Sequence, residues 1–179
     1  MSLRNSLGLL HSLIYIVRET IVDGLGFRTA IYSAGCNHRC HNCHNPKTWD
    51  INNGVLVHVQ EVYESLDIVR NPILSGVTFT GGDPMFQAEA FCELAKMIKK
   101  LHGKDIWCYT GYLLEEIIRS RDAKYELLKH VDVLVDGKYV DELRDLTLAF
   151  RGSSNQRIID VQESLKQVIT MDVNITYLK

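Results

Sequence analysis

The sequence has no hydrophobic run long enough to cross a membrane and no strong net charge. The uncharged stretch at residues 7–17 is shorter than the roughly 20 apolar residues that a bilayer requires. Arg18-Glu19-Thr20 follows it instead of a small-x-small cleavage site, and we interpret residues 13–17 as a first buried strand. A formal net charge of -2 excludes a global basic field that would attract nucleic acid or anionic lipid. We therefore expect neither a nucleic-acid partner nor a membrane partner.

The sequence also lacks the even set of separated cysteines that is typical of a disulfide framework. It has five cysteines, and Cys36, Cys40 and Cys43 stand in one loop with the spacing C-x3-C-x2-C. An odd number with this clustering favours a reducing compartment, where thiolates stay available for metal. We therefore expect a cytoplasmic protein. The other two, Cys92 and Cys108, have no partner in the sequence, and Cys108 is expected to pack in the hydrophobic core.

No repeat, linker or low-complexity stretch divides the 179 residues. We expect a single domain with a core over about residues 13–160 and a C-terminal extension over residues 161–179. Strand patterns alternate with helical patterns from residue 29 to 136, which predicts an α/β fold with βαβ units and a largely parallel sheet. The predicted strands are residues 29–34, 76–80, 105–109 and 131–135, with 157–161 and 168–173 as further candidates.

Residues outside the cysteine loop are interpreted as structural. In the strand 105–109, Cys108 shares a face with Ile106, while Trp107 and Tyr109 point the other way, and both faces are expected to pack. Four scattered histidines are each expected at the surface or with a satisfied hydrogen bond: His11, His58, His102 and His130.

Glycine-containing turns follow the predicted strands. In a parallel sheet the loops after the strands gather on one rim, and α/β folds usually place their chemistry there. Glycine lets the backbone approach a ligand closely. The cysteine loop is therefore expected to face a ligand-binding rim. The turns in question are Gly35-Cys36, Thr80-Gly81-Gly82-Asp83, Thr110-Gly111 and Asp136-Gly137-Lys138.

The number of cysteines in the loop indicates an open metal site. Structural zinc and ordinary ferredoxin clusters take four protein ligands, so three thiolates leave one position free. Zinc would need a histidine in addition, and His38, His41 and His44 are all available. A [4Fe-4S] cluster held by three thiolates would keep one iron for a substrate or cofactor, which predicts catalysis. Spacing alone leaves both metals open, with iron–sulfur favoured.

Two motifs resemble the radical S-adenosylmethionine superfamily. They are C-x3-C-x2-C at the end of an early strand and Thr80-Gly81-Gly82-Asp83-Pro84 after a later one. The flanking residues 22–28 (Val-Asp-Gly-Leu-Gly-Phe-Arg) and 43–49 (Cys-His-Asn-Pro-Lys-Thr-Trp) are similar to those of glycyl-radical-enzyme activating enzymes.

Three later segments resemble one branch of that family. Residues 105–112, 133–139 and 151–156 are similar to the activating proteins of the anaerobic (class III) ribonucleotide reductase. The resemblance runs from about residue 13 to 160. It implies a radical-SAM-type partial (βα) barrel, open on one side.

The resemblance also implies a mechanism and partners. Cys36, Cys40 and Cys43 would hold three irons, and the amino and carboxylate groups of S-adenosylmethionine would chelate the fourth. One electron would split the sulfonium into methionine and a 5′-deoxyadenosyl radical, which takes a hydrogen from a glycine of the reductase. The implied partners are the large subunit of the anaerobic ribonucleotide reductase, a glycyl radical protein, and an electron donor such as flavodoxin or ferredoxin.

Further site residues come from the same resemblance. The backbone of Gly81-Gly82-Asp83 would receive the methionine amino group, and Asn42-Cys43-His44 would line the adenine side. Lys138 would pair with the methionine carboxylate. Asp23 and Arg28 would shape the rim.

Two alternatives stay open at this stage. The near one is an activator of another glycyl radical enzyme, such as pyruvate formate-lyase, which differs only in its partner. The distant one is a structural zinc-binding interaction module that uses the three cysteines and one histidine. That module leaves the glycine-rich rim unexplained.

Overall fold

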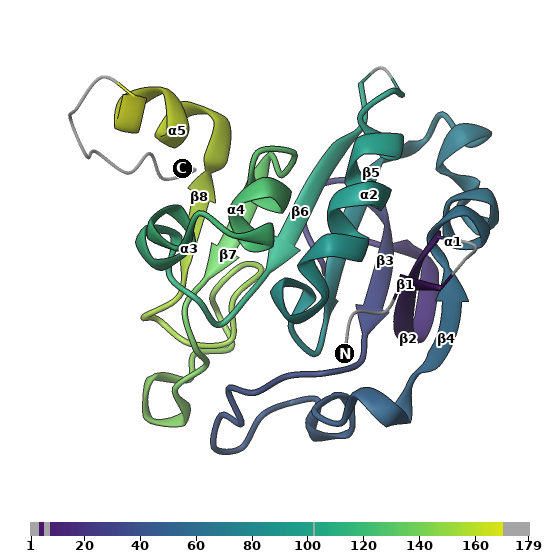
Figure 1. Cartoon of the computed structure of the whole chain (residues 1–179). Coiled ribbons are helices and arrows are strands. Elements are labelled where there is room, and N and C mark those ends of the chain that lie inside the picture. The colour runs from purple at the N-terminus through teal and green to yellow at the C-terminus, as the bar shows by residue number, and fades with distance from the viewer. Residues whose placement is uncertain (1–3, 6–7, 102, 170–179) are drawn as a thin grey trace.

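The computed structural model describes residues 4–5, 8–101 and 103–169. In this part of the chain the strands form one eight-stranded sheet in the order β1-β2-β3-β5-β6-β7-β8, with β4 paired to β2 (Figure 1). The strands are β1 Arg4–Asn5, β2 Gly8–Thr20, β3 Phe27–Ser33, β4 Val55–His58, β5 Leu74–Gly81, β6 Asp105–Tyr109, β7 Val133–Asp136 and β8 Arg157–Asp160.

Helices connect the strands after β4. The α-helices are α1 Val59–Ser65, α2 Ala88–Ile98, α3 Leu114–Ser120, α4 Ala123–Leu128 and α5 Val161–Ile169. Short 3-10 turns add η1 Pro46–Thr48, η2 Ile51–Asn53, η3 Asp67–Val69, η4 Pro84–Gln87 and η5 Asp141–Leu143. None of the helices in the described ranges is both long and apolar enough to span a bilayer.

The centre of the sheet is parallel, as the alternating pattern predicts. The pairs β3–β5, β5–β6 and β6–β7 are parallel, so the mixed α/β fold with parallel central strands is confirmed. The flanking pairs β2–β3 and β7–β8 are antiparallel. For β2 the reason is local, because a short turn at residues 21–26 can only join antiparallel neighbours.

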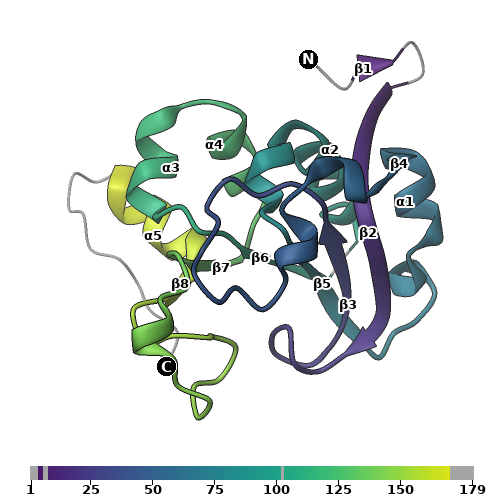
Figure 2. The ribbon, with the colours of Figure 1, turned by 90° about the horizontal axis from the view of Figure 1, so that it is seen from below.

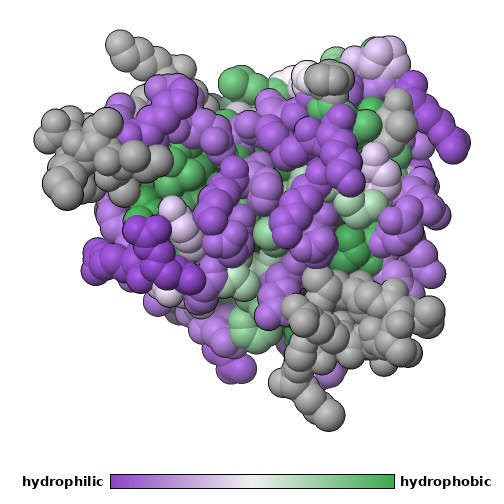
Figure 3. All heavy atoms as spheres, turned by 45° about the horizontal axis from the view of Figure 1, so that its top comes forward, coloured by the Kyte–Doolittle hydropathy of each residue, from purple (hydrophilic) through white to green (hydrophobic). Residues whose placement is uncertain are grey.

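Helices cover one face of the sheet. Ile31, Phe79 and Cys108 point to that face and share one core with Phe91 and Leu94 of α2. Seen from below, α2, α3 and α4 lie along one side of the sheet, α1 lies beside β2 and β4 at its edge, and the segments 21–26 and 137–156 lie on the other side (Figure 2). The expectation that Cys108 belongs to the core is confirmed, since it is 0% exposed, and the structure also buries Cys92, which is 4% exposed. Figure 3 shows a mostly hydrophilic surface, with hydrophobic side chains visible between polar ones.

The opposite face carries a smaller core and a buried arginine. Trp107 packs with Val133 and Val135 there. The Arg28 guanidinium lies 5.4 Å from the Trp107 ring centroid and donates through Nε to Thr78 Oγ1 at 2.8 Å. Arg28 also forms an ion pair with Asp105 at 2.5 Å. Because Arg28 is fully buried in the body of the sheet, the expectation that it shapes the rim is wrong.

Two predicted strands at the ends of the chain need correction. Residues 13–17 lie inside β2, but Tyr15 is 46% exposed, so this strand is not buried on both faces. The candidate at 157–161 is confirmed for residues 157–160, which form β8, whereas Val161 begins α5. The candidate at 168–173 is wrong for residues 168 and 169, which belong to α5, and its remainder lies outside the described residues.

His11 is another exception to the expectations. It lies on β2 with 0% exposure, and neither ring nitrogen has a hydrogen-bond partner within the described part of the chain. Its ring meets the Phe91 ring at 4.4 Å in an edge-on contact. Burial lowers the pKa of His11 from 6.5 to about 3. The imidazole is therefore a neutral, unpaired polar group in a hydrophobic core.

We predict that His11→Leu stabilises the protein by roughly 1–3 kcal/mol at neutral pH, because it removes a buried unsatisfied polar group at similar volume. The advantage should grow as pH falls through the window from 6.5 to about 3. In that window the unfolded chain binds a proton at His11 and the folded chain does not, so acid destabilises only the protein that retains the histidine. Urea unfolding of both proteins at several pH values measures the difference. A difference that stays constant with pH would contradict the burial argument.

Candidate functional site

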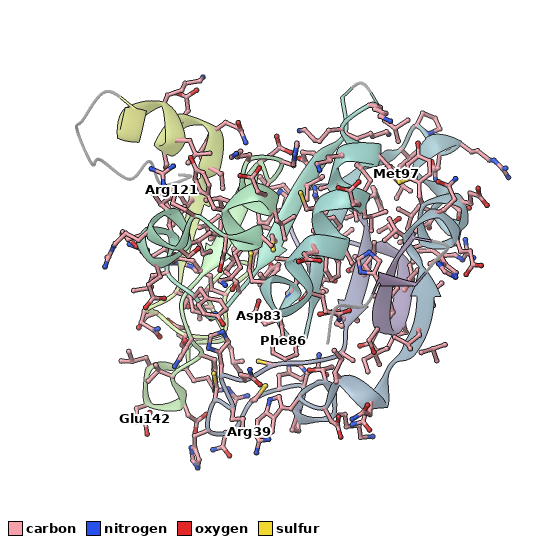
Figure 4. All side chains as sticks on the ribbon, viewed as in Figure 1. Arg39, Asp83, Phe86, Met97, Arg121 and Glu142 are labelled. Carbon is pink, nitrogen blue, oxygen red and sulfur yellow. The ribbon has the colours of Figure 1, made fainter. Side chains whose placement is uncertain are left out.

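The cysteine loop begins directly after β3, at the carboxyl end of the parallel strands. This confirms the expected position at the end of a strand. Cys36, Cys40 and Cys43 are free thiols with intermediate exposure. In Figure 4 the labelled Arg39 marks the loop at the lower edge of the molecule, with Asp83 and Phe86 between it and the strands.

Two residues with positive φ shape the loop. Arg39 has φ 47° and Asn42 has φ 53°, and asparagine tolerates this region better than most residues. The chain turns at Asn42, and the Cys43 amide donates to the Cys40 carbonyl at 3.1 Å. The Asn45 amide then donates to Cys43 Sγ at 3.4 Å.

Backbone hydrogen bonds fix the start of the loop. Gly35 N donates to Thr48 O at 2.7 Å, and Cys36 N donates to Trp49 O at 3.0 Å. From the neighbouring strand, Gly82 N donates to Ser33 O at 2.8 Å and Asp83 N to Gly35 O at 2.9 Å. The first cysteine is therefore held between the end of β5 and the turn at residues 46–49.

The structure shows why glycine is required at residues 81 and 82, and the reason differs from the expected close approach of a ligand. Gly81 has φ 99°, and a Cβ there would lie 2.5 Å from Ser33 N. A Cβ at Gly82 would lie 2.5 Å from Gly35 O. Glycine is thus required because the backbones of neighbouring loops pack against each other. The contact of these residues with a methionine amino group stays a prediction.

Asp83 is a buried junction of three loops. Its Oδ2 accepts from His38 at 2.7 Å, from Thr110 Oγ1 at 3.0 Å and from Gly111 N at 3.1 Å. Its Oδ1 accepts from Met85 N at 2.9 Å. Both carboxylate oxygens of Asp83 therefore have partners inside the protein, and the predicted contact of its backbone with the cofactor stays a prediction. Sequence reasoning weighed His38 only as a zinc ligand and missed its bond to Asp83.

The far end of the loop is tied to the segment after β7. Asn42 Nδ2 donates to Asp141 Oδ2 at 2.7 Å, and Tyr139 OH donates to Asp141 Oδ1 at 2.6 Å. Lys138 is exposed at the exit of β7. Burial raises the pKa of Cys40, and the Lys138 charge opposes that rise. The predicted pairing of Lys138 with the methionine carboxylate stays a prediction.

The titration of Cys36 is shifted in the same direction. Burial raises the pKa of the Cys36 thiol, and the negative charge of Asp83 raises it further. Metal binding at these thiols must therefore release protons. Among the described residues, no three His, Cys, Asp or Glu side chains are grouped so as to hold a single metal ion.

A pocket of about 480 Å³ lies between the loop and the turns at residues 46–53. Arg39, Trp49 and Phe86 are among its lining residues. The Phe86 side chain also touches the start of the loop, because a Cβ at Gly35 would lie 2.5 Å from its ring. The loop is therefore accessible from outside the molecule.

A comparison with protein families identifies the class of this site. Residues 22–159 match the family model described as a 4Fe-4S single cluster domain. This range includes the cysteine loop and the loops that follow β5, β6 and β7.

Curated relatives narrow the class. The chain is 39% identical over 140 residues to the anaerobic ribonucleoside-triphosphate reductase-activating protein of Enterobacteria phage T4, covering 76% of this chain and 86% of the relative. It is 36% identical to the protein of that name from Haemophilus influenzae over 77% of this chain and 90% of the relative. For the Escherichia coli K12 protein the identity is 35%, over 76% and 90%. The chain belongs to this family of 4Fe-4S reductase-activating proteins.

We predict that Gly82→Ala lowers the free energy of unfolding by roughly 2–3 kcal/mol, because the new Cβ must displace backbone. It would lie 2.5 Å from Gly35 O and 2.9 Å from Thr48 O. Gly103→Ala is the matched control, since its Cβ meets no described atom within 4 Å. Only its φ of 73° adds strain, which should lower the free energy of unfolding by about 1 kcal/mol. Urea unfolding compares the two. Equal losses would show that Gly82 is not a packing glycine.

Proposed function

We propose that this protein activates an anaerobic ribonucleoside-triphosphate reductase by reductive cleavage of S-adenosylmethionine at a [4Fe-4S] cluster. The observation that carries the proposal is the loop of three free, partly exposed thiols at the carboxyl end of the parallel strands. Family membership supports it, because the named relatives activate that reductase. Cys36, Cys40 and Cys43 are the proposed cluster ligands.

The donor set of the loop fits such a cluster. Thiolates are the ordinary ligands of iron–sulfur clusters. Among the described residues the loop offers three thiols, because Cys92 and Cys108 are buried in the core. One iron would thus lack a protein ligand. The Asn45 amide at Cys43 Sγ is the kind of outer hydrogen bond that tunes a bound cluster.

When bound and reduced, the cluster would supply one electron to the sulfonium of S-adenosylmethionine, giving methionine and a 5′-deoxyadenosyl radical that takes a hydrogen from a reductase glycine. This chain binds and orients the substrate. The amides of Gly82 and Asp83 donate within the protein, so backbone carbonyls in this stretch are the groups left to accept from the methionine ammonium. Lys138 pairs with the methionine carboxylate, and Asn42-Cys43-His44 lines the adenine side.

The fold and setting belong to the same proposal. We infer that the sheet is the partial barrel of radical S-adenosylmethionine enzymes, which the parallel strands β3, β5, β6 and β7 and the helices on one face support. The partners are the large, glycyl-radical subunit of the reductase and an electron donor such as flavodoxin or ferredoxin. The protein works in the cytoplasm.

We predict that Cys36→Ser, Cys40→Ser and Cys43→Ser each abolish cluster loading. After anaerobic reconstitution with iron and sulfide they should hold little iron and produce no 5′-deoxyadenosine with a strong reductant, because each change removes a ligand. Cys92→Ala is the matched control. It deletes a thiol that is buried in the core and should load and react like the unmodified protein.

The same reactions test the partner. With the reductase, the loaded protein should give a glycyl radical signal in electron paramagnetic resonance, and with pyruvate formate-lyase it should not. A signal with pyruvate formate-lyase alone would replace the proposed partner. Zinc held stoichiometrically after reconstitution, with no 5′-deoxyadenosine formed, would eliminate the proposal.

We predict that Lys138→Gln raises the S-adenosylmethionine concentration required for half-maximal cleavage about tenfold, the usual loss when one charged hydrogen bond is removed. Iron content should be unchanged, because Lys138 is no cluster ligand. Lys47→Gln is a control, since Lys47 is exposed in η1 rather than at the exit of β7. An unchanged concentration dependence for Lys138→Gln would remove Lys138 from the site.

A further inference from the structure

The His38 ring lies in a socket that the loops after β5 and β6 build. Its Nε2 is 2.7 Å from Asp83 Oδ2, and its side chain is 10% exposed. The Tyr112 ring packs against it edge-on, with centroids 4.7 Å apart. A Cβ at Gly111 would lie 2.5 Å from His38 Cδ2. The space that glycine leaves at position 111 is therefore filled by this imidazole.

The acceptor in the socket is immobilised. Asp83 is 2% exposed, and besides His38 it accepts from Met85 N, Thr110 Oγ1 and Gly111 N. A hydrogen bond to a carboxylate is stronger than a neutral one, and burial strengthens it further. His38 stands between Cys36 and Cys40 in the sequence. The bond thus fastens the cysteine loop at the midpoint between two of its thiols.

We propose that His38 is a positioning residue whose bond to Asp83 fixes Cys36 and Cys40 at the spacing required to retain the cluster. This inference rests on the proposed function, because it takes these cysteines as cluster ligands. His38 acts through the loop, because Asp83 holds its Nε2. Replacing a group that orients a metal ligand in this way typically lowers metal affinity 10–100-fold.

A second tie on the same loop provides the contrast. Asn42 bonds to Asp141 at 2.7 Å, but the contact is exposed. Exposed polar contacts compete with water and contribute little. The two ties therefore predict different effects: the loop should depend on the buried bond at His38 and tolerate loss of the exposed one at Asp141.

Four variants test the proposal. His38→Leu keeps the volume and removes the donor, whereas His38→Gln can place an amide nitrogen near the position of Nε2. Gly111→Ala leaves His38 in the chain but fills its socket, and Gly111 has no positive φ that would add backbone strain. Asp141→Ala is the control for the exposed tie.

Each variant is loaded anaerobically with iron and sulfide, and the rate of iron loss to a chelator is measured. The electron paramagnetic resonance spectrum of the reduced protein and the thermal midpoint of the metal-free protein are recorded beside it. His38→Leu and Gly111→Ala should lose iron at least about tenfold faster and give an altered spectrum. His38→Gln and Asp141→Ala should stay within about twofold of the unmodified protein, because the retained bond or the exposed contact leaves the loop in place.

The outcomes distinguish failure of the role of His38 from failure of the proposed function. If the unmodified protein holds no cluster, the proposed function fails. If it holds one and His38→Leu and Gly111→Ala lose iron at the same rate as it does, His38 is not a positioning residue. Fast loss from His38→Gln as well as from His38→Leu would also overturn the role of the hydrogen bond. Should His38→Leu not fold, Gly111→Ala and His38→Gln decide the question in the same way.

Discussion

The buried carboxylate of Asp83 is the contact on which the arrangement of the site depends. It follows β5 and accepts from His38 in the loop after β3 and from Thr110 and Gly111 after β6. Loops after parallel strands are separate connections that share only their position at one edge of the sheet. A charge-assisted hydrogen bond in a dry environment ties them with a strength that an exposed contact lacks. The cysteine loop thereby becomes part of a rigid rim.

The sheet makes such a rim possible. β3, β5, β6 and β7 run parallel, so their carboxyl ends meet on one edge. Helices cover one face of the sheet, and on the other face the buried Arg28 side chain donates to Thr78 on the neighbouring strand. Glycines at residues 81 and 82 let the exits of β3 and β5 approach to backbone contact. Three thiols with intermediate exposure are thus presented from a scaffold that is itself almost fully packed.

Features set by local sequence were predictable, and those set by distant contacts were not. The strand at 105–109 agrees with β6 because a hydrophobic run between turns identifies it, and the spacing of Cys36, Cys40 and Cys43 identifies their loop. The bond from His38 to Asp83 joins residues far apart in the chain, so no local pattern contains it. His11 is likewise buried without a hydrogen-bond partner in the described part of the chain because α2 packs against β2, with Phe91 in contact with its ring. One clue to the socket was present, because glycine after Thr110 indicated that something approaches that turn.

The proposed chemistry requires that the three thiols hold a cluster with one iron open to S-adenosylmethionine. Electron paramagnetic resonance of the reduced, iron-loaded protein tests it most directly, with and without S-adenosylmethionine labelled with nitrogen-15 in its amino group. We expect the substrate to change the spectrum of the cluster and a hyperfine coupling to the labelled nitrogen to appear. A spectrum that is the same with and without substrate, and shows no coupling to the label, would contradict it.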